Sequence, residues 1–239
     1  MAHRIAGSYG TDAPYVPIIS AVAGAAMLGY GLFAGGGVFA VVVAVLLLAQ
    51  AALYMYVTKD GKFTVWRELI EGLNLRGDET ALDIGCGRGM VLITLAQYLP
   101  SGRAVGLDLW RSKDQSGNSE EATMANAAAN GVAERVELVT GDMSDLGQFP
   151  DDTFAVVTAS VAIQNIKDAA LRERTVREML RVTKPGGQIL IADIQYSQQY
   201  EEVLVAAGAK DVERHSLGLR MMYGNPFFLS RIVRASKAA

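Results

Sequence analysis

The 239-residue chain has one cysteine, two histidines and, from Ala13 to Thr58, no charged side chain at all. A lone cysteine, Cys86, excludes an intrachain disulfide and a cluster of thiolate ligands. His3 and His215 are the only histidines, so a His/Cys zinc site is not expected and we predict no bound metal. The formal net charge of −3 gives no basic footprint for nucleic acid, which we do not expect as a partner.

The uncharged segment contains two apolar runs separated by the glycines 35–37. Residues 38–57 have the length and apolarity to cross a bilayer core of about 30 Å as a helix. Residues 16–34 have a similar length but contain more alanine and glycine. We therefore predict a transmembrane hairpin of two helices, which makes up an N-terminal domain of residues 1–58.

The charges beside this hairpin predict its orientation. Arg4 precedes it, Lys59 and Lys62 follow it, and its turn has no charge. This bias favours a cell-membrane protein whose main domain lies on the cytoplasmic side. Small residues recur at every fourth position of the first run, which suits helix packing inside the hairpin or between the protomers of a homo-oligomer. A signal peptide and a buried hairpin in a soluble oligomer are the alternatives.

Residues 59–239 form the second predicted domain, which begins with an amphipathic helix over 63–75. Strand-like runs then alternate with helical patterns. The expected strands are 80–85, 103–109, 135–142, 154–162, 188–194, 210–218 and 227–236, and the expected helices are 89–99, 119–131, 168–183 and 198–209. This alternation predicts an α/β fold with a Rossmann-like sheet of seven strands covered by helices on both faces. The last two strands have no long helix between them and should form an antiparallel hairpin.

A glycine-rich loop follows the first expected strand in the stretch LDIGCGRGM, residues 82–90. Gly85, Gly87 and Gly89 are spaced G-x-G-x-G, whereas the dinucleotide fingerprint is G-x-G-x-x-G and a P-loop needs a following lysine. Glycines lack a Cβ, so the backbone can pass beneath a flat, uncharged nucleoside.

The glycine loop resembles motif I of the class I S-adenosylmethionine-dependent methyltransferases. Three further segments resemble later motifs of that family in the right order: GLDLW at 106–110, VTGDM at 139–143 and LRVTKPGGQILIAD at 180–193. The resemblance covers about residues 62–236 and implies S-adenosylmethionine as the cofactor. The residues it implies for cofactor binding are Asp83, Gly85, Gly87, Gly89, Asp108, Leu109, Trp110, Asp142, Met143 and Ser160.

This resemblance also implies roles for several of these residues. Asp83 interacts with the methionyl ammonium, Asp108 accepts the ribose hydroxyls, and Asp142 accepts the adenine amino group with Met143 against the ring. Asp142 could instead cap its own loop. Trp110 could cover the adenine or close the acceptor pocket, or it could only pack the loop that follows it. Cys86 is expected to be a small packing residue.

A longer loop after the second strand, residues 111–118, is similar to that of a poorly characterised bacterial group of membrane-anchored methyltransferases. Its role is not apparent from the sequence. A histidine often stands in that group where this chain has Gln164, so a histidine base is not expected here.

The acceptor side is represented by Gln164 and Asn165, which follow the fourth strand where the sulfonium methyl group should point, and by Tyr223. These three are the candidate catalytic residues. Asn165 could instead cap the next helix. Tyr223 belongs to an apolar loop, 219–229, that suits an apolar acceptor, a lipid surface or the inside of a buried edge hairpin. Asp193 and Tyr196 are weaker candidates.

The sequence therefore predicts a membrane-anchored methyltransferase enzyme that uses S-adenosylmethionine. Its expected acceptor is small or lipophilic: a quinone precursor, a lipid or an apolar thiol. Two alternatives remain open. A nicotinamide-dependent oxidoreductase would need the glycine spacing that this loop lacks. A non-catalytic module that binds S-adenosylmethionine at the membrane would need no catalytic groups.

Overall fold

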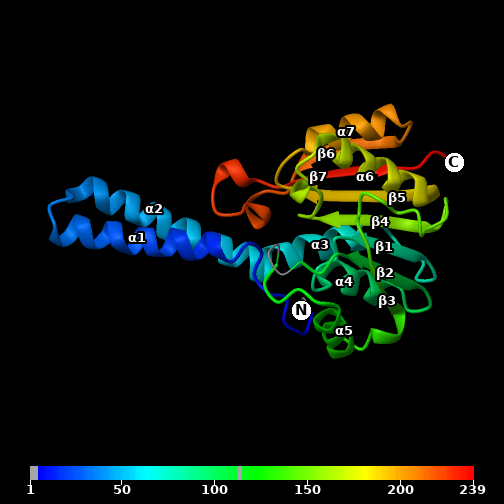
Figure 1. Cartoon of the computed structure of the whole chain (residues 1–239), viewed down its shortest axis with the longest axis horizontal. Coiled ribbons are helices and arrows are strands. Elements are labelled where there is room, and N and C mark those ends of the chain that lie inside the picture. Colours follow the sequence, from blue (N-terminus) through cyan, green and yellow to red (C-terminus); the bar gives the residue numbers. More distant parts are fainter. Residues whose placement is uncertain (1–4, 112–114) are drawn as a thin grey trace.

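In a computed structural model, which describes residues 5–111 and 115–239, a helical hairpin projects from an α/β domain (Figure 1). Helix α1 spans Tyr15–Phe33 and helix α2 spans Gly37–Tyr56, close to the two predicted runs. Arg4, on which the predicted orientation partly depends, and residues 112–114 of the predicted inserted loop lie outside the described residues.

Helix α2 is continuous with the α/β domain. It passes through a π-helical turn, η1 (Val57–Gly61), directly into α3 (Lys62–Glu71). The predicted linking helix is thus present, but it ends at Glu71 and not at residue 75, because Gly72 lies at its C-cap. On α3 the buried Trp66 donates its indole Nε1–H to Ser160 Oγ at 2.8 Å, which attaches the hairpin to the centre of the sheet.

The sheet has seven strands in the order β3-β2-β1-β4-β5-β7-β6. Strands β1 to β5 are parallel, and β7 runs antiparallel between β5 and β6, as predicted. The strands are β1 (Thr80–Ile84), β2 (Arg103–Asp108), β3 (Val136–Thr140), β4 (Phe154–Ser160), β5 (Thr183–Asp193), β6 (Lys210–Ser216) and β7 (Arg231–Ser236).

Helices cover both faces of this sheet. The α-helices after α3 are α4 (Met90–Tyr98), α5 (Glu120–Ala129), α6 (Ala169–Val182) and α7 (Ser197–Ala206), and the short 3₁₀ turns are η2 (Ala133–Arg135), η3 (Ile163–Asn165), η4 (Leu219–Met221) and η5 (Pro226–Phe228). One core cluster includes side chains of α3, α4 and α5, and the other includes side chains of α6 and α7. The helices after β1 and β2 thus cover one face, and the helix after β4 covers the other. The loops that follow these strands therefore diverge at the carboxyl edge between β1 and β4, where ligands bind in such sheets.

The starts of two strands also differ from the prediction. The stretch 184–187 was expected to lie between helix and strand, but β5 already begins at Thr183 and includes it, with Gly186 at φ +74°. The last strand was expected from residue 227 but begins at Arg231. Residues 226–228 form η5 instead, because Asn225 accepts a hydrogen bond from Phe227 N and Pro226 favours the first helical position.

The segment before α1 lies against the α/β domain. Asn126 on α5 accepts a hydrogen bond from Ser8 N and donates one to Ser8 O, at 2.8 and 2.9 Å. Asn130 accepts a hydrogen bond from Ala6 N at 2.9 Å. At the other end of the segment, Tyr54 donates its hydroxyl to Asp12 O. The division into domains 1–58 and 59–239 stays a prediction.

Candidate cofactor and acceptor site

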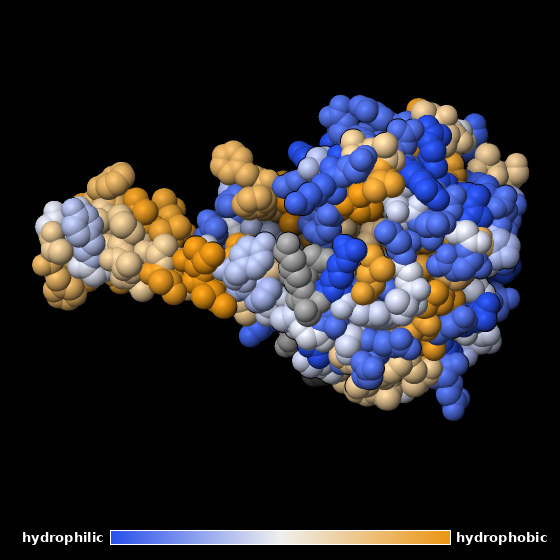
Figure 2. Space-filling view, viewed as in Figure 1, coloured by the Kyte–Doolittle hydropathy of each residue, from blue (hydrophilic) through white to orange (hydrophobic). Residues whose placement is uncertain are grey.

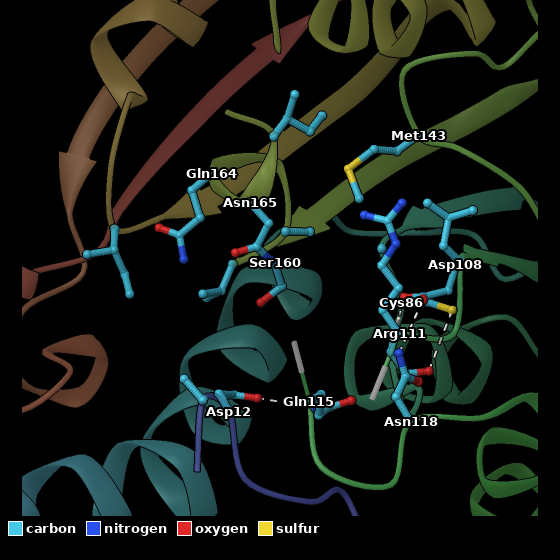
Figure 3. Close-up of a pocket in the computed structure, with 18 of the residues that line it drawn as sticks. Asp12, Cys86, Asp108, Arg111, Gln115, Asn118, Met143, Ser160, Gln164 and Asn165 are labelled. Atoms are coloured by element: carbon cyan, nitrogen blue, oxygen red, sulfur yellow. Dashed lines mark hydrogen bonds between the residues drawn. The ribbon is translucent and has the colours of Figure 1, made fainter. Parts of the chain in front are cut away.

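A cavity of about 770 Å³ lies at the carboxyl edge of β1, β2 and β4 (Figure 3). This volume falls toward the upper end of the range of ligand pockets. The predicted site residues that line the cavity are Asp83, Gly85, Gly87, Asp108, Leu109, Asp142, Met143, Ser160, Gln164, Asn165 and Tyr223. Gly89, Trp110 and the two weaker candidates Asp193 and Tyr196 lie outside this lining.

The glycine loop passes between β1 and α4 in a conformation that requires glycine. Gly85 has φ +64° and Gly87 has φ +52°. A Cβ on Gly85 would lie 2.5 Å from Ala162 Cβ, and a Cβ on Gly87 would lie 2.5 Å from Gln115 Oε1. Gly85 therefore has neither the backbone freedom nor the space for a side chain, and a side chain at Gly87 would strain the backbone and displace the Gln115 amide. Gly89 serves another purpose, as the left-handed N-cap residue of α4.

Asp108 ends β2 and organises the loops around it. Its Oδ2 accepts a hydrogen bond from Gly87 N at 2.8 Å, and its Oδ1 accepts from Trp110 N at 2.6 Å and from Asn118 Nδ2 at 3.1 Å. A carboxylate has about four acceptor positions, so about one remains for a ligand hydroxyl. The expectation that Asp108 accepts both ribose hydroxyls directly would require one of these protein donors to move.

Trp110 points away from the cavity in this structure. It has φ +56°, and its indole Nε1–H donates to Thr140 Oγ1 at 2.8 Å at the end of β3. Its ring lies against the core cluster on the α4 side of the sheet. In this geometry Trp110 contacts β3 and the core, so the structure supports neither of the two roles at the cavity that the sequence left open.

Asp83 is buried beneath the glycine loop. Thr158 donates its hydroxyl to Asp83 Oδ1 at 2.7 Å. Burial raises the pKa of the Asp83 carboxyl to about 7, and the charge of Asp108 adds to the increase, whereas the Thr158 hydrogen bond opposes it. A positive ligand group beside Asp83 would favour its charged form.

Asp142 and Met143 follow β3 and line the side of the cavity that is predicted to hold the nucleoside. Asp142 Oδ1 accepts from both the N–H and the hydroxyl of Ser144 at 2.8 Å, so Asp142 does cap its own turn. It also lines the cavity, and the two roles are compatible because its other carboxylate oxygen is not used in this turn. Figure 3 shows Met143 and Asp108 on the same side of the cavity, away from Gln164.

Gln164 and Asn165 lie in η3, directly after β4, and line the opposite end of the cavity. Asn165 does not cap α6. That cap is Asp168, whose Oδ1 accepts from Ala170 N and Leu171 N. Asn165 is therefore not held in the capping role that was its main alternative.

Asp193 supports η3 from below without lining the cavity. Its Oδ2 accepts from Gln164 N at 3.0 Å and from the Tyr200 hydroxyl at 3.1 Å. Burial raises the pKa of its carboxyl to about 7. Tyr196 stacks on Arg172, with the guanidinium carbon 3.6 Å from the ring centre, and is also absent from the lining. Both residues therefore act on the site only through neighbours.

A polar cluster around Asp12 closes the end of the cavity that is predicted to hold the acceptor, and sequence reasoning missed it. Asp12 Oδ2 accepts from Lys62 Nζ at 2.7 Å and from the Tyr223 hydroxyl at 3.1 Å. Asp12 Oδ1 accepts from Gln115 Nε2 at 3.2 Å, as Figure 3 shows. Asp12 is the last charged residue before the apolar hairpin, but nothing in its spacing indicates that it returns to the carboxyl edge of the sheet.

Tyr223 is buried, and its environment decides what it can do chemically. Burial raises the pKa of its hydroxyl well above the usual value, and the charge of Asp12 raises it further. The hydroxyl therefore stays protonated and donates a hydrogen bond, which excludes a role as a base at neutral pH. Cys86 is similarly inert, because burial and two nearby carboxylates raise the pKa of its thiol.

These residues fit S-adenosylmethionine by their chemistry. A buried carboxylate at β1 suits an ammonium, a carboxylate with remaining acceptor capacity at β2 suits a ribose hydroxyl, and Met143 offers a soft surface for a ring. Between these groups, the glycine loop lines the cavity with backbone that carries no side chain at Gly85 and Gly87.

Residues 82–191 match the model of a family described as a methyltransferase domain. Demethylmenaquinone methyltransferase of Symbiobacterium thermophilum is 33% identical over 136 residues, which are 56% of this chain and 50% of that protein. The protein of the same name from a Geobacillus species, strain WCH70, is 34% identical over 127 residues, 52% of this chain and 50% of that protein. The chain thus spans about half the length of these curated relatives.

Solved structures share the fold at lower identity. The cyclase SpnF superposes with a TM-score of 0.59 at 19% identity, over 72% of this chain and 80% of that one. A SAM-dependent methyltransferase of Methanosarcina mazei gives a TM-score of 0.56 at 18% identity, over 71% of this chain and 97% of that one. The family match, the strand order and the site chemistry agree with each other. Residues 82–191 therefore belong to a methyltransferase domain, and its site fits S-adenosylmethionine as the cofactor.

Proposed function

We propose that this protein is a membrane-anchored enzyme that methylates a lipophilic acceptor of the quinone-precursor class. The observation that carries the proposal is one cavity lined by residues of both the α/β domain and the hairpin. Its nucleotide end is lined by Asp108 and Met143, and its other end is lined by Val16 of α1 and Tyr54 of α2. The names of the two relatives, which describe methylation of demethylmenaquinone, support the choice of acceptor class.

The hairpin supports a membrane location. Helices α1 and α2 have 19 and 20 residues, so each is about 30 Å long at 1.5 Å per residue. They are long and apolar enough to cross a membrane, yet only 17% and 22% of their most apolar stretches are buried. A core helix of a soluble protein would be mostly buried. Exposed tyrosines, Tyr15 and Tyr56, mark the end near the domain, as is typical of membrane interfaces.

The cofactor, when bound, supplies an electrophilic methyl group on a sulfonium. Asp83 would hold the ammonium, Asp108 a ribose hydroxyl and Asp142 the adenine edge. The protein's contribution is mainly alignment and exclusion of water, which can supply much of the acceleration of a displacement reaction.

At the acceptor end, the side-chain amides of Gln164 and Asn165 are the groups that orient the acceptor. Tyr223, which stays protonated, donates a hydrogen bond and fixes Asp12 beside Lys62. No histidine lies among the described residues of this cavity. This set suits an acceptor that ionises easily, such as a hydroquinone, better than one that needs a strong base.

The proposal is tested with detergent-solubilised full-length protein, methyl-labelled S-adenosylmethionine and a total extract of host cells. The extract is separated after reaction into organic, aqueous and headspace fractions. We expect label in the organic fraction, in a product that carries a quinone-type chromophore. Label only in the aqueous fraction would show that the acceptor is not lipophilic and that the hairpin is only a tether.

A further inference from the structure

The loop that joins β6 to β7 runs along the hairpin, away from the sheet (Figure 1). The carbonyl of Arg220 lies directly against Gly61, at the base of the hairpin. Tyr223 then packs edge-on against Tyr54, with ring centres 5.3 Å apart. At Gly224 the backbone reaches Gln50, so closely that an added Cβ would lie 2.8 Å from Gln50 Cγ. The order of these contacts shows that the loop rises along α2.

The position of these contacts along α2 shows how far the loop extends from the domain end of the hairpin. Gln50 is six residues before Tyr56, the last residue of α2, which corresponds to about 9 Å along the helix axis. If α2 crosses a bilayer with its end at the polar boundary, this part of the loop lies below the headgroups. Amphipathic segments at membrane surfaces bury their apolar side to a comparable depth, about 5–10 Å.

The side chains of the loop suit that depth. No charged residue stands between Arg220 and Arg231. Phe227 is 91% exposed, Leu219 69% and Phe228 40%. The interpretation of this loop as the inside of a buried edge hairpin is therefore wrong for these three side chains, although Tyr223 is buried. Arg220 remains on the polar side, where it pairs with Glu68 at 2.7 Å.

We propose that the loop of residues 219–229 inserts into the leaflet next to the α/β domain and forms, with the base of α1 and α2, a mouth through which the acceptor enters from the bilayer. The occupant of this surface is lipid, because exposed apolar side chains of the loop project on the same side of the domain as the exposed apolar hairpin (Figure 2). The mouth leads to the site, since Val16, Tyr54, Tyr223 and Phe228 all line the cavity. This inference rests on the proposed membrane location and lipophilic acceptor.

Insertion is tested by spin labelling of the full-length protein in nanodiscs of phosphatidylcholine and phosphatidylglycerol. A nitroxide is attached to Phe227→Cys, and its collisions with oxygen and with a water-soluble nickel chelate are compared. The native Cys86 is buried and serves as the unlabelled background. Val45→Cys, on the exposed face of α2, is the reference for lipid, and Glu202→Cys, on α7, is the reference for water.

We expect the label at 227 to resemble the label at 45, with high oxygen access and nickel access reduced at least several-fold relative to position 202. A label at 227 that is as accessible to nickel as the label at 202 would contradict insertion. It would leave a soluble protein partner as the occupant of this surface. If the label at 45 were itself accessible to nickel, the membrane hairpin, and with it this proposal, would be wrong.

A second measurement concerns entry of the acceptor. Leu219→Asp and Phe227→Asp change exposed side chains, so the fold should tolerate them. We expect each to raise KM at least several-fold for a naphthohydroquinone with a polyprenyl tail, without a change for the tail-less compound. An equal effect on both acceptors would contradict the mouth. Insertion of the loop without any methyl transfer would confirm the membrane contact but refute both the proposed function and the role of the loop in acceptor entry.

Discussion

The carboxylate of Asp12 and the ammonium of Lys62 form an ion pair, with Oδ2 and Nζ 2.7 Å apart, at the junction of the hairpin and the methyltransferase domain. The side chain of Lys62 is only 4% exposed and that of Asp12 is 18% exposed. The pair joins the segment before α1 to the first turn of α3. It thereby holds that segment over the acceptor end of the cavity.

Removal of one partner of this pair should therefore be costly. In Lys62→Met we expect a loss of about 3 kcal/mol of stability, because a buried carboxylate loses its counter-charge. Asp12→Asn should cost a similar amount, and the double variant less than the sum. Denaturation of the full-length protein in detergent measures these values. Additive losses would show that the two groups do not interact in solution.

Asp108 should dominate the affinity for the nucleoside. Asp108→Asn removes the charge that three protein donors and a ligand hydroxyl share, so we expect S-adenosylhomocysteine to bind roughly 10- to 100-fold more weakly. Calorimetric titration measures the change. Glu202→Gln, an exposed substitution on α7, is the matched control and should leave Kd unaltered. Unchanged binding by Asp108→Asn would remove this residue from the cofactor site.

The raised pKa of Asp83 predicts a pH dependence of cofactor binding. Below pH 7 the free protein holds this carboxyl protonated, and the ligand ammonium must displace that proton. Affinity for S-adenosylhomocysteine should therefore rise from pH 6 to pH 8 and then level off, with a slope approaching tenfold per unit at the acid end. Asp83→Asn should bind weakly with no such slope. Asp193→Asn, which alters a carboxyl of similar pKa outside the cavity, should keep it.

The glycine loop can be tested against a glycine with the same backbone strain elsewhere. Gly87 and Gly186 both have positive φ, but an added Cβ meets Gln115 at Gly87 and nothing within 4 Å at Gly186. Both alanine variants should lose about 1 kcal/mol of stability or more. Only Gly87→Ala should also lose cofactor affinity, by more than tenfold. Equal binding by the two variants would mean that the loop does not contact the cofactor.

The sequence predicted the sheet and its antiparallel end because these depend on local patterns. Alternating apolar runs define the strands, and the strand ends carry Asp83, Asp108 and Asp142 to one edge. The two helices of the hairpin could be predicted for the same reason, since they lie in a continuous uncharged segment.

What the sequence did not reveal depends on contacts between distant residues. Asp12 reaches the cavity through Lys62 and Tyr223, which are 50 and 211 positions away. The orientation of Trp110 follows from its left-handed backbone and its bond to Thr140, neither of which has a local signature. The path of the 219–229 loop along α2 likewise follows from close approaches at Gly61 and Gly224.

The most direct test of the account supplies a defined acceptor. Full-length protein in nanodiscs is given methyl-labelled S-adenosylmethionine and either a polyprenylated naphthohydroquinone in the bilayer or its tail-less analogue in water. We predict labelled, methylated product from the bilayer acceptor, with kcat/KM at least tenfold above that of the analogue. Transfer to the analogue alone, or to neither compound while a water-soluble metabolite is methylated, would contradict a membrane-derived acceptor.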